Sequence, residues 1–233
     1  MTENKKQENK SHLFGLLGRN ISYSFSSGYF NEKFNDLGLK NHSYVNFDIP
    51  VIDDFSTLPK QEIKGMNVTI PYKEEIIPFL DMIDSEAKEI GAVNTIKFLA
   101  SGKLKGYNTD VFGFEKSLKP LLKLHHTKAL ILGTGGASKA VKYALDNLGI
   151  ESVFVSRNPI GGSQISYNQL NESIIDEYTV VVNCTPLGTF PETDLCPDLP
   201  YQFIGSKHLL YDLIYNPSET TFLKKGKEKG AII

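Results

Sequence analysis

No run of apolar residues in this chain approaches the roughly 20 that a membrane-spanning helix needs. Acidic and basic residues nearly balance, with a formal net charge of −2, and no long basic stripe is present. Nucleic-acid binding therefore has no electrostatic support. Residues 1–12 are polar and lysine-rich and are followed by no signal-peptide pattern, so we expect a loose tail there. The composition, 40% hydrophobic and 22% charged, is that of an ordinary soluble globular protein.

Cysteine is scarce as well. The two cysteines, Cys184 and Cys196, fit no metal-ligand spacing and provide no disulfide framework, so a reducing, cytoplasmic setting is expected. The five histidines are scattered, and the pair His125-His126 falls in an expected linker. We assign no metal to them.

Strand-like and helix-like segments alternate along the chain, which predicts an α/β architecture. We expect two lobes with a cleft between them: residues 1–109 as the substrate domain and residues 110–233 as a Rossmann-like NADP domain. The break at residues 122–128 is an alternative seam. A Gly/Ser-rich loop is expected at residues 159–166. Strands are expected at residues 13–18, 43–48, 65–70, 93–99, 104–108, 128–132, 152–156, 179–183 and 209–214, and helices at 29–37, 73–79, 84–90, 110–122, 137–148 and 218–229.

The most informative stretch is KALILGTGGAS, residues 128–138. A strand runs into a glycine turn, and a helical pattern follows. Glycines allow a tight turn and a close approach of a pyrophosphate to the N–H groups at a helix start. In this context the motif predicts dinucleotide binding. The residues expected to contact the pyrophosphate are Gly133, Thr134, Gly135, Gly136 and Ala137.

The next strand ends at Ser156-Arg157, without the acidic residue that usually binds the ribose hydroxyls of NAD. An arginine is suited to a 2′-phosphate, because its planar fork can make two parallel hydrogen bonds to phosphate oxygens. The expected cofactor is therefore NADP(H). The alternative is a surface arginine that merely follows a strand.

A dinucleotide site implies hydride transfer, and a partner must then move the hydroxyl proton. Lys73 follows an expected strand, and Asp110 begins an expected helix. If these two segment ends are neighbours, a lysine of adjustable pKa would exchange the proton. The helix N-terminus would keep the aspartate ionised. From spacing alone, an ordinary surface lysine and an ordinary helix N-cap are the default interpretation of these two positions.

Seven segments, taken together and in order, resemble the shikimate dehydrogenase family, from about Phe14 to the end of the chain. They are GLLGRNISYSFS (15–26), NVTIPYKE (67–74), GAVNT (91–95), NTD (108–110), GTGGAS (133–138), NCTPLG (183–188) and YDLIYNP (211–217).

The resemblance implies NADP-dependent reduction of 3-dehydroshikimate to shikimate, in the chorismate pathway to aromatic amino acids. It implies Lys73 and Asp110 as the catalytic pair. The substrate contacts that it implies are Ser24, Ser26, Thr69, Asn94, Asp110 and Tyr215. Besides the glycine turn, the cofactor contacts that it implies are Ser156, Arg157, Thr185 and Leu213. Hydroxyl and amide side chains suit a small anion with three hydroxyls, because each buried polar group left unpaired costs about 1–3 kcal/mol.

The chain departs from the family pattern at several places. Tyr23 and Ser27 stand where the family usually has histidine and proline, and Ser138 takes the third glycine position. Family members continue past a pair like Gly230-Ala231 into closing helices that bring a glutamine to the substrate. Either those helices lie beyond Ile233 or the protein lacks them, in which case an apolar face of the substrate lobe would be uncovered.

Other interpretations stay open. Ser24 and Ser26 also suit turns, Asn94 a strand-end cap, and Thr185 a helix N-cap. The functional alternatives are a dual quinate/shikimate dehydrogenase and a non-catalytic NADPH sensor, although a sensor needs neither Lys73 nor Asp110. The expected partners are the small substrate and cofactor, with no nucleic acid or membrane, in a monomer or homodimer.

Overall fold

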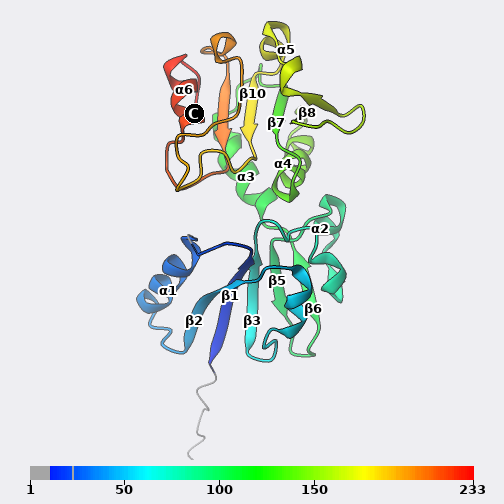
Figure 1. Cartoon of the computed structure of the whole chain (residues 1–233), viewed down its shortest axis with the longest axis vertical. Coiled ribbons are helices and arrows are strands. Elements are labelled where there is room, and N and C mark those ends of the chain that lie inside the picture. The colour runs from blue at the N-terminus through cyan, green and yellow to red at the C-terminus, as the bar shows by residue number, and fades with distance from the viewer. Residues whose placement is uncertain (1–10, 23) are drawn as a thin grey trace, which may run out of the picture. The chain divides into compact units, whose positions relative to one another are not determined.

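The computed structural model describes residues 11–22 and 24–233, and it divides into two compact units, Met1–Asn108 and Thr109–Ile233 (Figure 1). Residues 1–10 of the expected tail, and Tyr23, lie outside the described residues. His12 does not belong to a tail, because it begins the first strand and its ring stacks on that of His42 with centroids 4.6 Å apart.

The first unit contains one mixed sheet in the order β2-β1-β3-β5-β6-β4. β1 is parallel to β2 and β3, whereas β5 is antiparallel to β3 and β6. The carboxyl ends of β1, β2, β3 and β6 therefore share one edge with the start of β5. The elements are β1 (His12–Gly18), α1 (Ser26–Asp36), β2 (His42–Asp48), η1 (Ile52–Thr57), β3 (Ile63–Val68), η2 (Ile77–Phe79), β4 (Met82–Ile83), α2 (Ser85–Ile90), β5 (Thr95–Phe98) and β6 (Leu104–Tyr107).

Two apolar clusters stabilise this sheet. The larger one includes the fully buried side chains of Phe55, Tyr72 and Ile96. The smaller one joins α1 to the sheet through Phe30 and Tyr44, whose rings stack with centroids 4.6 Å apart. Burial of this aromatic pair anchors α1 against β2.

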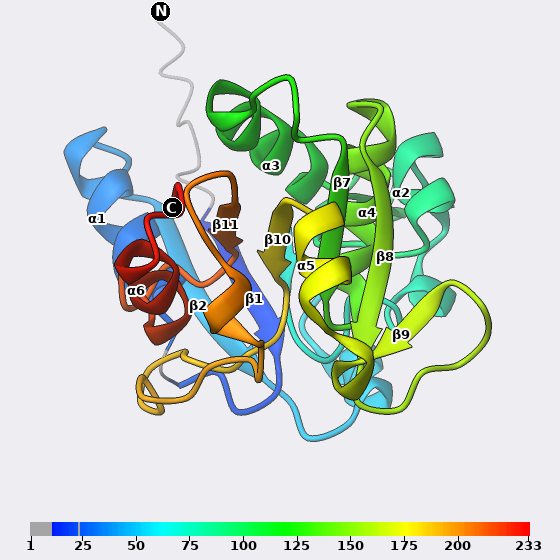
Figure 2. The same ribbon diagram turned by 90° about the horizontal axis from the view of Figure 1, so that it is seen from above.

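The second unit contains a sheet of parallel strands in the order β11-β10-β7-β8-β9. In Figure 2, α4 lies beside β7 and β8, and α6 beside β11. The apolar β7 and β10 are buried on both faces, as parallel strands usually are. The elements are α3 (Asp110–Leu118), η3 (Lys119–Leu121), β7 (Lys128–Leu132), α4 (Gly136–Asn147), β8 (Glu151–Ser156), β9 (Gln164–Ser166), η4 (Tyr167–Gln169), α5 (Glu172–Glu177), β10 (Val180–Asn183), η5 (Tyr201–Phe203), β11 (Leu209–Asp212) and α6 (Thr221–Glu228).

Most expected elements are confirmed, with differences that have local causes. Residues 73–79 form turns and the short η2 instead of a helix, because the Lys73 carbonyl accepts a hydrogen bond from the N–H of Val93 (2.7 Å). The expected loop 159–166 contains β9, which pairs with β8. Leu37, the last residue of the helix expected at 29–37, is the C-cap of α1 and is 63% exposed.

The sequence analysis also missed α5. Its signal is the N-cap Asn171, whose side chain accepts a hydrogen bond from the N–H of Ile174 (3.1 Å). Asparagine is among the preferred N-cap residues because its oxygen satisfies one of the unpaired N–H groups of the first turn.

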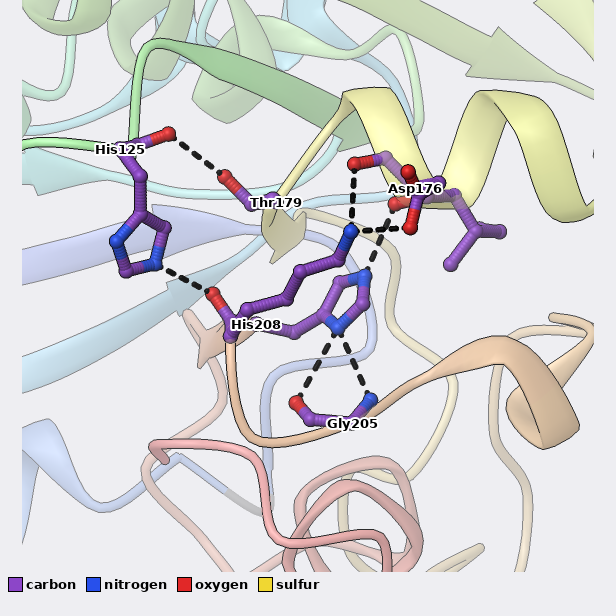
Figure 3. Close-up of polar contacts among 7 residues, drawn as sticks. His125, Asp176, Thr179, Gly205 and His208 are labelled. Carbon is purple, nitrogen blue, oxygen red and sulfur yellow. Dashed lines mark hydrogen bonds and ion pairs between the residues drawn. The ribbon is translucent and has the colours of Figure 1, made fainter.

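Histidines fix the amino edge of the second sheet, where β7, β10 and β11 begin (Figure 3). The Lys207 carbonyl lies 3.0 Å from His125 Nε2 and 3.1 Å from His126 Nε2. The N–H of Lys123 donates to His126 Nδ1 (3.0 Å), so the ring of His126 is held in its neutral form. His208 bridges two segments in the same way, between the N–H of Gly205 and the carbonyl of Ile175.

This arrangement predicts acid sensitivity. Burial lowers the pKa of His126 below its ordinary value of 6.5, and the neighbouring His125, Lys123 and His208 act in the same direction. As the pH falls through about 6.5, the His126 imidazole therefore takes up a proton in the unfolded chain but stays neutral in the folded one. Stability is full above that pH and falls as the pH drops below it.

The check is the free energy of unfolding in urea at pH 7.5 and pH 5.5. We expect His126→Gln to lose less stability than the wild type over this range, and the difference cannot exceed about 1.4 kcal/mol per pH unit. Equal losses in the two proteins would contradict the assignment. The remaining histidines are common to both, so they cancel in the comparison.

Candidate functional site

The loop that carries Ser24 and Ser26 is held by the carboxyl end of β2. Asp48 accepts hydrogen bonds from the N–H groups of Asn20 (2.8 Å) and Ile21 (3.0 Å). Ser24 Oγ in turn accepts from the N–H of Ser26 (3.2 Å), which begins α1. A carboxylate that accepts two successive N–H bonds is a strong and specific clamp. The clamp holds Asn20 and Ile21 at the carboxyl end of β2, and the N–H of Ser24 donates to the Ile21 carbonyl (2.9 Å).

Thr69 lies at the same edge. Its N–H donates to the carbonyl of Leu17 (2.9 Å), and its methyl group approaches Gly18 so closely that a Cβ there would lie 2.7 Å from it. Glycine at position 18 is therefore required by close approach. No larger residue would let β1 and the end of β3 meet in this way.

Asn94 and Lys73 complete the set in the first unit. The Asn94 carbonyl accepts from the N–H of Val68 (2.8 Å). Asn94, just before β5, therefore lies beside the end of β3, which Thr69 follows. Asn94 is 7% exposed, and its Oδ1 accepts a hydrogen bond from Thr95 Oγ1 (3.0 Å). Lys73 is half-buried in the turn after β3, and its carbonyl is bonded to Val93. The structure thus brings four expected site segments to one edge of one sheet.

Two expected substrate residues belong to the second unit. Asp110 is half-buried and is the first residue of α3, where an aspartate favourably meets the helix dipole. Tyr215 follows β11 and is 65% exposed. The pairing of Lys73 with Asp110 stays a prediction, because the two residues belong to different units.

The glycine turn has the expected form. Gly133 has φ +105°, a conformation that favours glycine, and a Cβ there would meet Thr185 Cγ2 at 3.3 Å and the Cys184 carbonyl at 3.4 Å. Gly135 is the N-cap of α4, and no side chain caps this helix. Ser138 is fully buried, and its hydroxyl donates to the Gly135 carbonyl (2.6 Å). The first-turn N–H groups of α4 therefore provide donors for an anion.

Ser156 ends β8 and Arg157 follows it, at the same edge of the sheet. Ser156 Oγ accepts from the N–H of Asn158 (3.2 Å), which turns the chain, and Arg157 is exposed. Burial raises the pKa of Tyr167 to about 12, while the Arg157 charge opposes that rise. Arg157 directly follows β8, so its backbone lies at the carboxyl edge of the sheet.

A buried polar network organises the other half of this edge. Asp212 Oδ1 accepts from Asn183 Nδ2 (3.1 Å) and from the N–H of Ile214 (3.0 Å), and its Oδ2 accepts from Thr220 Oγ1 (2.6 Å). Burial raises the pKa of Asp212, and these three hydrogen bonds oppose the rise. The N–H of Leu213 donates to the Asn183 carbonyl (3.1 Å). The sequence analysis missed the role of this carboxylate.

The same network restricts what Thr185 can do. Its hydroxyl donates to Asn183 Oδ1 (2.7 Å) and accepts from the N–H of Leu187 (3.3 Å). A hydroxyl has only one hydrogen to donate. In this arrangement, Thr185 offers a ligand its methyl group and one acceptor lone pair.

The strand order locates the candidate cofactor edge. From β7 the chain proceeds outward through β8 and β9, and then returns to the other side with β10 and β11. The carboxyl ends of β7 and β10 therefore flank a topological switch point, where open α/β sheets usually bind ligands. Gly133 and Thr185 lie at that point.

Within residues 11–22 and 24–233, no cluster of three or more histidine, cysteine or carboxylate side chains is arranged to hold a metal ion. No helix in the same part of the chain has the length and apolar character needed to cross a membrane.

Comparison with known proteins gives a consistent result. Residues 16–96 match the family model described as the shikimate dehydrogenase substrate binding domain. A curated relative, shikimate dehydrogenase (NADP(+)) of Methanosphaera stadtmanae, is 37% identical, over 95% of this chain and 84% of the relative.

Solved structures agree. The crystal structure of shikimate dehydrogenase from Aquifex aeolicus has a TM-score of 0.82 at 39% identity, covering 95% of this chain and 85% of that one. Shikimate 5-dehydrogenase from Thermus thermophilus, solved with NADP(H) and shikimate, has a TM-score of 0.80 at 31% identity, covering 94% and 85%.

Proposed function

This chain belongs to the shikimate dehydrogenase family, and from that premise we propose that it catalyses the NADP-dependent interconversion of 3-dehydroshikimate and shikimate. The observations that carry the proposal are two sheet edges, one in each unit. One edge gathers hydroxyl and amide groups with a lysine, and the other has a glycine turn followed by Arg157. In biosynthesis the reaction serves the chorismate pathway to aromatic amino acids.

In the first unit, Ser24 and Ser26 hold the substrate carboxylate, and Thr69 and Asn94 bind ring hydroxyls. Lys73 gives its proton to the carbonyl oxygen during reduction and takes it back during oxidation. From the second unit, Asp110 orients the same hydroxyl and Tyr215 adds a contact. Short neutral donors and acceptors suit this polyhydroxylated anion, because few of its polar groups would be left unpaired.

The second unit fits NADP. Bound NADPH would supply the hydride, and the residues of this chain bind and orient it. The α4 N-terminus with residues 133–137 takes the pyrophosphate, Ser156 and Arg157 the adenosine phosphate, and Thr185 and Leu213 the nicotinamide side. The conformation of Gly133, with φ +105°, supports this proposal, since it forms the tight turn through which a pyrophosphate can approach the start of α4.

The test is an absorbance assay of NADP⁺ reduction in the presence of shikimate, with quinate as a parallel arm. We expect turnover with shikimate and NADP⁺. Absence of turnover with intact NADPH binding would favour the sensor interpretation. Comparable turnover of quinate would establish a dual-substrate enzyme.

We further propose that the enzyme works in the cytoplasm as a monomer or homodimer, without nucleic-acid or membrane partners. The near-neutral net charge of −2 and the low cysteine content, two residues in 233, support this view. Light scattering of the purified protein would give the oligomeric state.

A further inference from the structure

A chain of side-chain hydrogen bonds leads to Asn94 through the first unit. Tyr44 Oη donates to Asn67 Oδ1 (2.8 Å), and Asn67 Nδ2 donates to Thr95 Oγ1 (3.3 Å). Thr95 Oγ1 then donates to Asn94 Oδ1 (3.0 Å). In this series of hydrogen bonds each group donates toward Asn94. The series therefore has one direction and ends on the oxygen of the Asn94 amide.

The start of the chain is firmly held. Tyr44 is 4% exposed and stacks on Phe30 of α1. Its backbone is held by Asn31, whose Oδ1 accepts from the Tyr44 N–H (2.9 Å) and whose Nδ2 donates to the Tyr44 carbonyl (2.8 Å). The phenol hydroxyl therefore reaches Asn67 from a fixed position.

The surroundings make the chain costly to break. Tyr44, Asn67 and Thr95 line a groove of about 460 Å³. Its other walls are largely apolar and include Phe14, Phe30, Phe34, Met66 and Ile96, and Lys64, Lys97 and Tyr107 line it as well. Apolar walls supply few alternative partners, so loss of one link leaves its neighbour under-satisfied.

We propose that Tyr44, Asn67 and Thr95 are positioning residues, which orient the Asn94 amide so that its oxygen faces Thr95 and its nitrogen is presented to a substrate hydroxyl. This inference rests on the proposed function. It adds three residues that act on the substrate site through Asn94. If the Asn94 amide were rotated by half a turn, its oxygen would face the substrate in place of its nitrogen. The site would then offer the substrate hydroxyl an acceptor instead of a donor.

The experiment uses conservative variants of the full chain. Thr95→Val removes the central hydroxyl while keeping the shape, Thr95→Ser keeps the hydroxyl, and Tyr44→Phe keeps the stacked ring. The matched control is Tyr72→Phe, because Tyr72 is 1% exposed in the same unit and its hydroxyl donates elsewhere, to the Ile49 carbonyl (2.7 Å). The measurements are KM and kcat for shikimate at saturating NADP⁺, the Kd of NADPH, and the melting temperature.

We expect Thr95→Val to raise the KM for shikimate by about 10-fold and Tyr44→Phe by about 3-fold, with the Kd of NADPH unchanged. Thr95→Ser should stay close to the wild type, and Tyr72→Phe should alter the melting temperature alone. In an Asn94→Ala background, Thr95→Val should have no additional effect on KM, because it acts through Asn94.

The outcomes separate the two ideas. A wild-type protein without shikimate turnover overturns the proposed function and, with it, the positioning role. Turnover with an unchanged KM in Tyr44→Phe and Thr95→Val overturns the positioning role alone. An equal rise of KM in Tyr72→Phe, or an undiminished effect of Thr95→Val in the Asn94→Ala background, also overturns it.

Discussion

Lys73→Ala is expected to lower the turnover of shikimate by roughly 10²–10⁴-fold, the usual contribution of a positioned general acid or base. The Kd of NADPH should stay nearly unchanged, since the glycine turn and Arg157 belong to the other unit. Lys73→Arg should be almost as inactive. Arginine keeps the positive charge but does not release its proton in the working pH range.

The kinetic control is Lys103→Ala, in the exposed turn between β5 and β6 at the opposite edge of the first sheet. It should behave as the wild type does. A Lys73→Ala protein that loses NADPH affinity and turnover to the same degree would show that the lysine is structural. Melting temperatures of the three variants separate that outcome from unfolding.

Arg157→Ala is expected to weaken NADPH binding by roughly 10- to 100-fold and to leave NADH binding nearly unchanged. Hydrogen bonds to charged groups contribute about 1.5–3 kcal/mol each, and NADH lacks the 2′-phosphate that would receive them. Arg157 is exposed, so its removal should disturb the fold little. Fluorescence titration with each cofactor measures the ratio of the two affinities.

The matched control is Lys142→Ala, which removes a positive charge from α4, where the lysine pairs with Asp146. That variant should keep the preference for NADPH. If Arg157→Ala keeps it as well, the assignment of the phosphate site is wrong. High salt should reduce the wild-type preference, because an exposed guanidinium–phosphate contact is screened.

Much of the fold could be predicted because strong local signals agree with the tertiary structure. The structure has the elements that the sequence predicted at three places: the apolar strands β7 and β10, the glycine turn, and the hairpin between β5 and β6. The helix expected at residues 73–79 failed for a non-local reason: the Lys73 carbonyl bonds to Val93, which lies 20 positions further along the chain. Helix propensity does not reveal such a competitor.

The candidate site likewise has features that depend on local sequence and features that depend on contacts between distant residues. The glycine turn follows from local chain geometry and could be predicted from the sequence. The role of Asp48, which clamps the N–H groups of Asn20 and Ile21, could not, because 27 or more residues separate the partners. Asn183 and Asp212 are 29 residues apart and meet only when β10 and β11 pair.

The half-buried Asp212 also makes the effects of substitutions in three parts of the second unit non-additive. Its two oxygens serve the Asn183 side chain, the backbone after β11 and the N-cap Thr220 of α6. The three donors together offset the desolvation of the Asp212 carboxylate. Loss of any one donor therefore destabilises the carboxylate to which the other two segments are also hydrogen-bonded. Substitutions in these three segments therefore all perturb the same carboxylate, and the changes that they cause in the free energy of unfolding do not add.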